Sequence, residues 1–139
     1  MTSLPPRALW LRLFLPFAAG YLLSYLYRTS NAVISPVLAR DLSLPDHALG
    51  LLTSTYFLAF GAAQLPLGIL LDRFGPRRVE SILLLVAASG AVVFAIADDL
   101  AGLAWGRALI GLGVSACLMA AFKAFNQSFP AERQASLIG

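Results

Sequence analysis

Two long apolar runs, joined by a very short charged segment, constrain this chain more than any other feature. The runs cover Leu49–Leu71 and Ser81–Ala97, and a helix of roughly 20 mainly apolar residues can cross a lipid bilayer. Hydrophobic residues make up 59% of the chain and charged residues 12%, whereas about 25% charged is usual in soluble domains. We therefore expect an all-α integral membrane protein with the bilayer as its main partner.

Four segments are predicted to span the membrane, at approximately residues 10–38, 47–71, 79–97 and 100–125. A fifth span is predicted to begin near residue 133. So short a start cannot cross a bilayer, and we expect this chain to be the N-terminal part of a longer protein. Ser43 is expected to cap the second helix, because serine accepts hydrogen bonds from free backbone N–H groups. The run after Arg12 lacks a small-residue cleavage site, which favours an uncleaved span over a signal peptide.

The positions of Lys and Arg predict which ends of the helices face the cytoplasm. Arginines precede the first span, lie between the second and third, and follow the fourth: Arg7, Arg12, Arg73, Arg77, Arg78 and Arg133. The turn between the third and fourth spans carries Asp98 and Asp99 and no base. We expect a bacterial-type inner membrane, with the N-terminus cytoplasmic. Topology explains the net charge of +3 better than nucleic-acid binding does.

The charged segment carries the pattern G-x-x-x-D-R-x-G-x-R-R from Gly68 to Arg78. This pattern resembles the cytoplasmic loop signature of the major facilitator superfamily of secondary transporters. Arg107, Gly111 and Gly113 give R-x-x-x-G-x-G in the fourth span, which is similar to a second signature of that superfamily. The resemblance covers essentially all 139 residues. It implies a twelve-helix fold of two six-helix halves that rock around a central site.

The loop residues are expected to gate that motion. Gly68 would let the second span pack tightly against a partner, and Gly75 with Pro76 would make the turn. Asp72 would accept hydrogen bonds from a helix N-terminus of the other half, which would latch one state of the cycle. The three loop arginines would enforce orientation and pair with carboxylates; the residues concerned are Arg73, Arg77 and Arg78 with Asp72, Glu80 or Glu132. Alternatively, these charges only satisfy the rule that positive flanks stay inside.

Arg28 is the sharpest candidate for substrate binding, because a charged residue well inside a span is costly. Polar residues recur around it at three- and four-residue steps and share one helix face: Tyr21, Ser24 or Tyr25, Arg28, Asn31 and Ser35. The guanidinium fork suits carboxylate or phosphate. Alternatively, the helix ends early and Arg28 reaches the outer interface, or Arg28 pairs with a carboxylate beyond this chain.

The residue before Arg28 narrows the substrate class. Many proton-coupled drug exporters of the superfamily carry an aspartate there, and this chain has Tyr27, which argues against that subgroup. Families that transport organic anions often have a first-span arginine, so the resemblance favours a small anionic substrate. Coupling to a proton or to a counter-substrate is expected. No Asp or Glu lies in the middle of a predicted span, so a coupling carboxylate would come from beyond this chain.

Three further polar residues each have two interpretations. Gln64 is expected to hydrogen-bond across the substrate cavity or to hold the neighbouring helix. Lys123 would help bind an anion or extend to the lipid headgroups. Arg107 would serve proton coupling or structural pairing, as the resemblance implies, or it would lie near the outer interface beside Asp98 or Asp99.

Several kinds of chemistry have no support in the sequence. The chain has no phosphate-binding loop of the G-x-x-x-x-G-K-[ST] type, and His47 and Cys117 are its only histidine and cysteine. We therefore predict no enzyme, no catalytic residue, no metal and no cofactor. The rival to a transporter is a four-helix membrane assembly or regulatory subunit without transport activity of its own.

Overall fold

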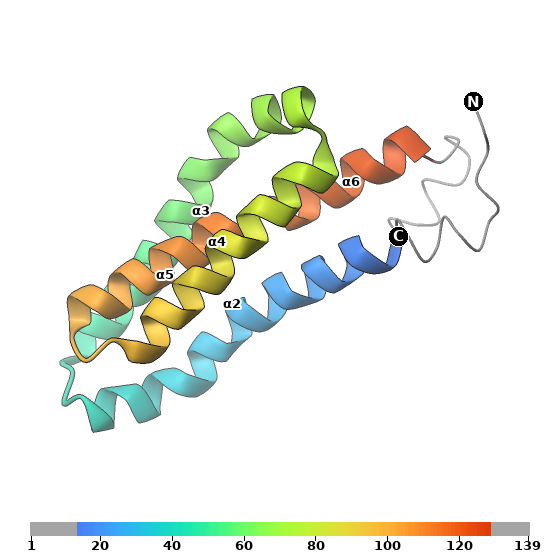
Figure 1. The fold of residues 1–139 in the computed structure, drawn as a ribbon. Coiled ribbons are helices and arrows are strands. Elements are labelled where there is room, and N and C mark those ends of the chain that lie inside the picture. Colours follow the sequence, from blue (N-terminus) through green and yellow to red (C-terminus); the bar gives the residue numbers. More distant parts are fainter. Residues whose placement is uncertain (1–13, 129–139) are drawn as a thin grey trace.

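The computed structural model describes residues 14–128, and all regular structure in this range is helical. The elements are α2 (Leu15–Asp41), α3 (Asp46–Phe74), α4 (Pro76–Ile96), α5 (Leu100–Val114) and α6 (Cys117–Ser128). Helices α2 to α5 run back and forth, with their connections at alternate ends, and α6 continues the course of α5 (Figure 1). This is the all-α membrane architecture that the apolar runs predict.

Three stretches of the described chain are helical, long and apolar enough to cross a membrane: His47–Phe74, Pro76–Ile96 and Leu100–Ala124. Helix α2 is also long, with 27 residues, or about 40 Å at 1.5 Å per residue. It is not among the three, and polar residues such as Arg28 and Ser30 lie within it. The start of the first predicted span and the whole of the fifth lie outside the described residues.

A single residue, Gly75, connects α3 to α4. Its φ of 80° and ψ of 156° lie in a region that essentially only glycine occupies. Pro76 then begins α4, where its ring presets the helical φ and its missing N–H costs nothing. The turn thus lies at Gly75 and Pro76, where the sequence places it.

The predicted cap of α3 is wrong. Ser43 has a φ of 49°, and its N–H donates to the carbonyl of Arg40 at 3.4 Å, so it belongs to the turn that ends α2. Pro45 occupies the capping position and no side chain caps α3. The proline displaces the helix start by two residues from the serine that could have capped it.

The fourth predicted span is divided into two helices near Ser115. The backbone N–H and the hydroxyl of Ser115 both donate to the carbonyl of Leu112, at 3.3 Å and 2.6 Å. Serine hydroxyls that bond back to their own helix compete with the regular ladder and bend it. The helix therefore restarts at Cys117, and the carbonyl of Ser115 is left at the break.

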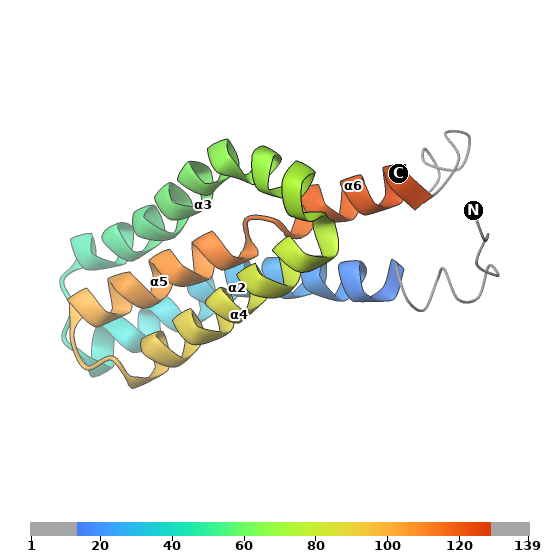
Figure 2. The same cartoon turned by 45° about the horizontal axis from the view of Figure 1, so that its top comes forward.

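Helices α5 and α6 form the centre of the bundle. In its most apolar 18-residue stretch, Leu100–Ala124 is 61% buried, compared with 22% for α3 and for α4. In Figure 2, α5 lies between α3 and α4. Alanines at every fourth position of the central segment are fully or almost fully buried: Ala116, Ala120 and Ala124. Small residues let membrane helices approach closely, and the α4–α5 contact shows this at Gly113, where a Cβ would lie 2.3 Å from the backbone nitrogen of Ala87.

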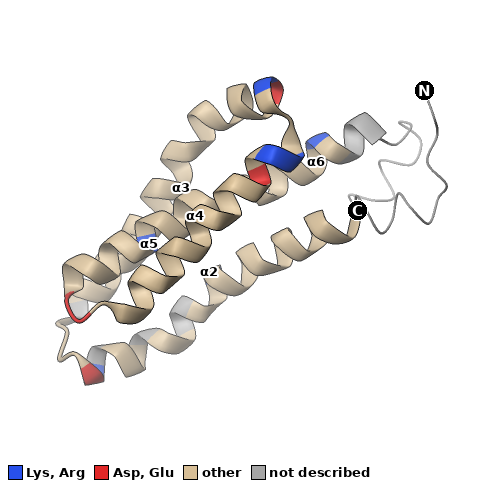
Figure 3. Ribbon diagram, in the orientation of Figure 1, with Lys and Arg blue, Asp and Glu red and all other residues tan. Residues whose placement is uncertain are grey.

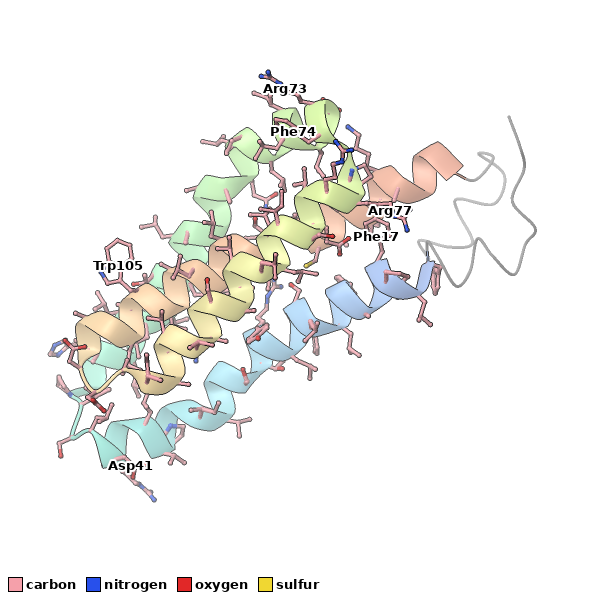
Figure 4. The ribbon with its side chains drawn as sticks, in the orientation of Figure 1. Phe17, Asp41, Arg73, Phe74, Arg77 and Trp105 are labelled. Atoms are coloured by element: carbon pink, nitrogen blue, oxygen red, sulfur yellow. The ribbon has the colours of Figure 1, made fainter. Side chains whose placement is uncertain are left out.

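Charged residues of the described chain gather near the helix ends (Figure 3). The labelled Arg73 and Arg77 lie at the end where α3 meets α4 (Figure 4), while Asp98 and Asp99 lie between α4 and α5 at the other end. Trp105 points away from the bundle and is 68% exposed. Two arginines are exceptions to this distribution. Arg107 lies inside α5 and is buried, and Arg28 lies at the middle of α2.

Candidate functional site: the α3 face

One face of α3 carries a row of aromatic and polar residues, and side chains of α2 and α6 contact this row. Its members follow one another at near four-residue spacing and so lie along one side of the helix; we call them the α3 face: Phe57, Phe60, Gln64, Gly68 and Asp72. From Phe60 to Asp72 the face extends about 18 Å. Arg28 of α2 contacts its first part, and Lys123 of α6 contacts its last residue.

Arg28 lies at the middle of α2 and is exposed. Its guanidinium carbon is 5.6 Å from the ring centroid of Phe60 and 6.0 Å from that of Phe57. Such contacts contribute about 0.5–1 kcal/mol each at exposed sites, which is enough to orient the side chain. Because α2 continues to Asp41, the alternative in which the helix ends early at Arg28 is wrong. Among the described residues no carboxylate pairs with Arg28, so its fork of donors is open to a ligand.

Two tyrosines of the predicted polar stripe lie on the same side of α2 as Arg28. Tyr21 is 49% exposed and Tyr25 is 56% exposed, and their spacing from Arg28 places the three on one face. Ser24 is 7% exposed and faces the bundle instead. The side chains of Asn31 and Ser35 lie outside the described residues.

A groove of about 560 Å³ lies between α3 and α6. Gln64, Gly68 and Asp72 line it from α3, and Met119, Phe122 and Lys123 line it from α6. The structure thus brings two predicted substrate-binding residues, Gln64 and Lys123, to one groove. Its mixed polar and apolar lining suits a small organic solute better than a bare ion.

Asp72 forms an ion pair with the Lys123 ammonium group. The Asp72 side chain is 80% exposed and that of Lys123 is 22% exposed. This corrects two expectations, because Asp72 pairs with a lysine of α6 rather than a loop arginine, and Lys123 turns to a carboxylate rather than extending to headgroups. Exposed ion pairs contribute about 0–1 kcal/mol, so Asp72 can exchange this partner for another at little cost.

Gln64 donates from Nε2 to the carbonyl of Ser115 at 3.2 Å. That carbonyl lies at the break between α5 and α6, and an amide donor from α3 replaces the helical hydrogen bond lost there. Of the two predicted roles for Gln64, holding the neighbouring helix is the one seen in this geometry. The same side chain also lines the groove, so it connects the groove to the break.

Two of the remaining loop arginines, Arg73 and Arg78, form no ion pair with a carboxylate of the described residues. The Arg73 guanidinium lies 5.5 Å from the ring centroid of Phe74, and Arg78 is exposed. Gly68 is exposed, and a Cβ added there meets nothing within 4 Å in the described chain. The tight packing expected of Gly68 is therefore absent from this part of the protein, while Arg77 keeps a position beside the turn (Figure 4).

Glu80 is buried rather than paired with an arginine. It is 6% exposed, and its Oε1 has no hydrogen-bond partner within residues 14–128. The carboxylate lies against Gly20 of α2, where a Cβ would come within 2.4 Å of Oε1. The other expected acidic partner, Glu132, lies outside the described residues.

The burial of Arg107 contradicts one of its two interpretations from the sequence, the position near the outer interface. Arg107 is 3% exposed, and its guanidinium carbon lies 4.5 Å from the ring centroid of Phe94. Asp99 instead caps α5 by accepting from the N–H of Gly102 at 2.9 Å. Arg107 therefore neither reaches the outer interface nor pairs with Asp98 or Asp99. Gly111, the next residue of the motif, faces α3, where a Cβ would lie 2.3 Å from the carbonyl oxygen of Tyr56.

The family model described as the Major Facilitator Superfamily matches residues 17–139. This chain belongs to that superfamily. Both motifs of the sequence therefore lie in a superfamily chain, the loop motif between α3 and α4 and the second motif in α5. No solved structure gives a significant match.

Curated superfamily relatives support the match. A probable sulfoacetate transporter of Cupriavidus necator is 29% identical over 81% of this chain and 26% of its own length. The hexuronate transporter of Bacillus subtilis is 31% identical over 88% of this chain and 29% of its own length. The glucose transporter of Staphylococcus epidermidis is 30% identical over 89% of this chain and 28% of its own length. The chain thus spans less than a third of the length of these superfamily members.

Sequence reasoning missed the aromatic residues of the α3 face. Phe57 and Phe60 received no role, although the four-residue spacing of Phe60, Gln64, Gly68 and Asp72 places them on one helix face. That spacing was the available signal. No sequence signal indicated the burial of Glu80 against Gly20, because residues so far apart in the sequence meet only through the packing of α2 on α4.

Proposed function

We propose that this protein is a secondary transporter that moves a small organic anion across the membrane by alternating access. Membership of the superfamily supports transport, and one observation supports an anion. Arg28 lies exposed at the middle of α2, oriented by two phenylalanine rings, with no carboxylate partner among the described residues. Its planar fork matches a carboxylate bidentately.

In this proposal the α3 face lines one wall of the substrate path. Arg28 binds the anionic group, Tyr21 and Tyr25 offer hydroxyl groups beside it, and the groove at Gln64 and Lys123 continues the path. The end that carries Arg73, Arg77 and Arg78 faces the cytoplasm, which places the N-terminus of the bundle there too. The rest of the protein supplies the opposite wall, and a proton or a counter-substrate drives the cycle in an inner membrane.

Two relatives are named for sulfoacetate and hexuronate and one for glucose, so the test compares an acidic sugar with a neutral one. The intact protein is reconstituted into liposomes, and uptake of radiolabelled glucuronate and of glucose is measured. We expect the protein to take up glucuronate. Other carboxylates should inhibit this uptake by competition, and glucose should not. Uptake of glucose alone would contradict the anionic substrate. Correctly folded protein that moves neither, nor any tested carboxylate, would favour the assembly subunit.

Replacement Asp72→Asn is expected to lower transport about three- to tenfold per inserted molecule. It removes the ion pair with Lys123 and the charge proposed to complement a helix N-terminus of the other half, and 1.4 kcal/mol corresponds to about tenfold. The measurement is initial uptake, normalised to the amount of protein in the membrane. Asp98→Asn, at an exposed aspartate of the opposite end, is the matched control. Equal uptake by both variants would contradict a gating role for Asp72.

A further inference from the structure

A second cavity, open on one side, lies away from the α3 face. It has a volume of about 90 Å³ and lies between α2, α4 and α5. Its polar lining comes from Tyr27, Ser30 and Arg107, and its remaining wall comes from Phe94 and aliphatic residues. Among the described residues no acidic side chain lines it, and each charged or hydroxyl-bearing group that they bring to this space can donate a hydrogen bond.

Arg107 provides the charge of this cavity. Arg107 is only 3% exposed, and the ring of Phe94 covers one face of the guanidinium. Within residues 14–128 its Nε atom has no hydrogen-bond partner, and no carboxylate there forms an ion pair with it. A cation buried without a counter-charge is strongly unfavourable, and inside a membrane span it calls for an anionic partner.

The described groups packed around Arg107 carry no negative charge. Tyr27 and Ser30 approach from α2, and the Ser30 hydroxyl donates to the carbonyl of Tyr27 at 3.2 Å. That hydroxyl can rotate toward another acceptor. Tyr56 of α3 is close enough to interact electrostatically with Arg107, and its hydroxyl also lacks a partner within the described residues. The described neighbours of Arg107 thus offer hydroxyl groups that can donate to an anion.

We propose that Arg107, Ser30 and Tyr27 form a binding site for one small anion, either a halide or the carboxylate end of an organic acid. The cavity holds about three water molecules at roughly 30 Å³ each, so it admits a chloride ion or a carboxylate group but not a whole sugar acid. The site differs from the one at Arg28, which is exposed on the α3 face. It does not depend on transport, because binding alone defines it.

Chloride binding to the intact protein in detergent tests this site. The line width of the ³⁵Cl nuclear magnetic resonance is followed while chloride is titrated into the protein at constant ionic strength. The balancing anion is a bulky sulfonate, which carries no carboxylate. We expect the protein to broaden the chloride resonance, and we expect this added line width to fall to a limit as chloride fills the site. Ser30→Ala is expected to weaken chloride binding about tenfold, since it removes a hydrogen bond to a charged group.

Ser89→Ala is the matched control, because Ser89 is an exposed serine whose hydroxyl bonds only to its own helix, at the carbonyl of Val86. It should leave chloride binding unchanged. Arg107→Gln should abolish binding; if this variant does not fold, Tyr27→Phe together with Ser30→Ala gives the same test without removing the charge. Equal chloride affinity in the Ser30 and Ser89 variants would overturn the assignment.

A competition series distinguishes the two sources of the anion. Displacement of chloride by acetate and glucuronate at low concentration indicates a site for the carboxylate end of an organic acid. Chloride that only bromide or nitrate displaces indicates a halide site. Absence of saturable binding of both chloride and acetate to the wild-type protein would overturn the proposal, and would mean that a carboxylate from elsewhere in the protein neutralises Arg107.

Discussion

Replacement of Arg28 by lysine is expected to reduce the uptake of an organic anion about 10- to 100-fold. The guanidinium is held beside Phe57 and Phe60 and presents a planar fork that an ammonium group cannot reproduce. A charge-assisted hydrogen bond contributes about 1.5–3 kcal/mol, and each 1.4 kcal/mol is about tenfold. The measurement is the concentration dependence of initial uptake of a labelled carboxylate into liposomes.

Arg40→Lys is the control for the Arg28 variant. Arg40 is an exposed arginine in the last turn of the same helix, and the same exchange there should leave uptake within a factor of two, as expected of an exposed position with little energetic role. Unchanged uptake kinetics in Arg28→Lys would remove Arg28 from the substrate site. A fall of equal size in both variants would assign the loss to arginine chemistry in general.

Replacement Gly113→Ala is expected to destabilise the bundle by about 1–3 kcal/mol or more, because overpacking a closely packed contact has that cost. A Cβ at this position would come within 2.3 Å of the backbone nitrogen of Ala87 and 2.5 Å of the carbonyl of Leu83. Neither backbone atom can move aside without shifting α4. The readout is the midpoint of thermal unfolding of the intact protein in detergent.

Gly61→Ala gives the opposite expectation. Gly61 is an exposed residue of α3, and a Cβ there meets nothing within 4 Å. Alanine in a helix interior is about 0.5–1 kcal/mol better than glycine, so this variant should unfold at a slightly higher temperature. Equal midpoints for the two variants would contradict the close α4–α5 contact.

The helices and the turn could be predicted because each depends on local sequence. A run of apolar residues demands a helix in lipid whatever its neighbours are, and Gly75 followed by Pro76 is compatible with few backbone paths other than a break between two helices. The superfamily could be predicted from the loop motif for the same reason, since the residues of that motif lie close together in the chain.

The pairing of charges could not be predicted, because it depends on which helices meet. The lysine of α6 and the aspartate of α3, Lys123 and Asp72, are far apart in the sequence and pair only through the packing of α6 on α3. The alternative that placed Arg107 near the outer interface came from its position along the span, and that position does not tell whether a neighbouring helix covers the side chain. Here Phe94 of α4 covers it. The break at Ser115 likewise depends on which carbonyl accepts a hydrogen bond from the Ser115 hydroxyl.

The connection through Gly75 has a consequence for how the protein is made. Only one residue lies between Phe74 and Pro76. During synthesis this connection is too short for α3 to cross the bilayer while α4 is still in water away from the membrane. Backbone without internal hydrogen bonds is not tolerated among lipid tails, so the turn must stay at the headgroups. We therefore expect α3 and α4 to enter the membrane together as one helical hairpin, with the translocation machinery handling them as a single unit.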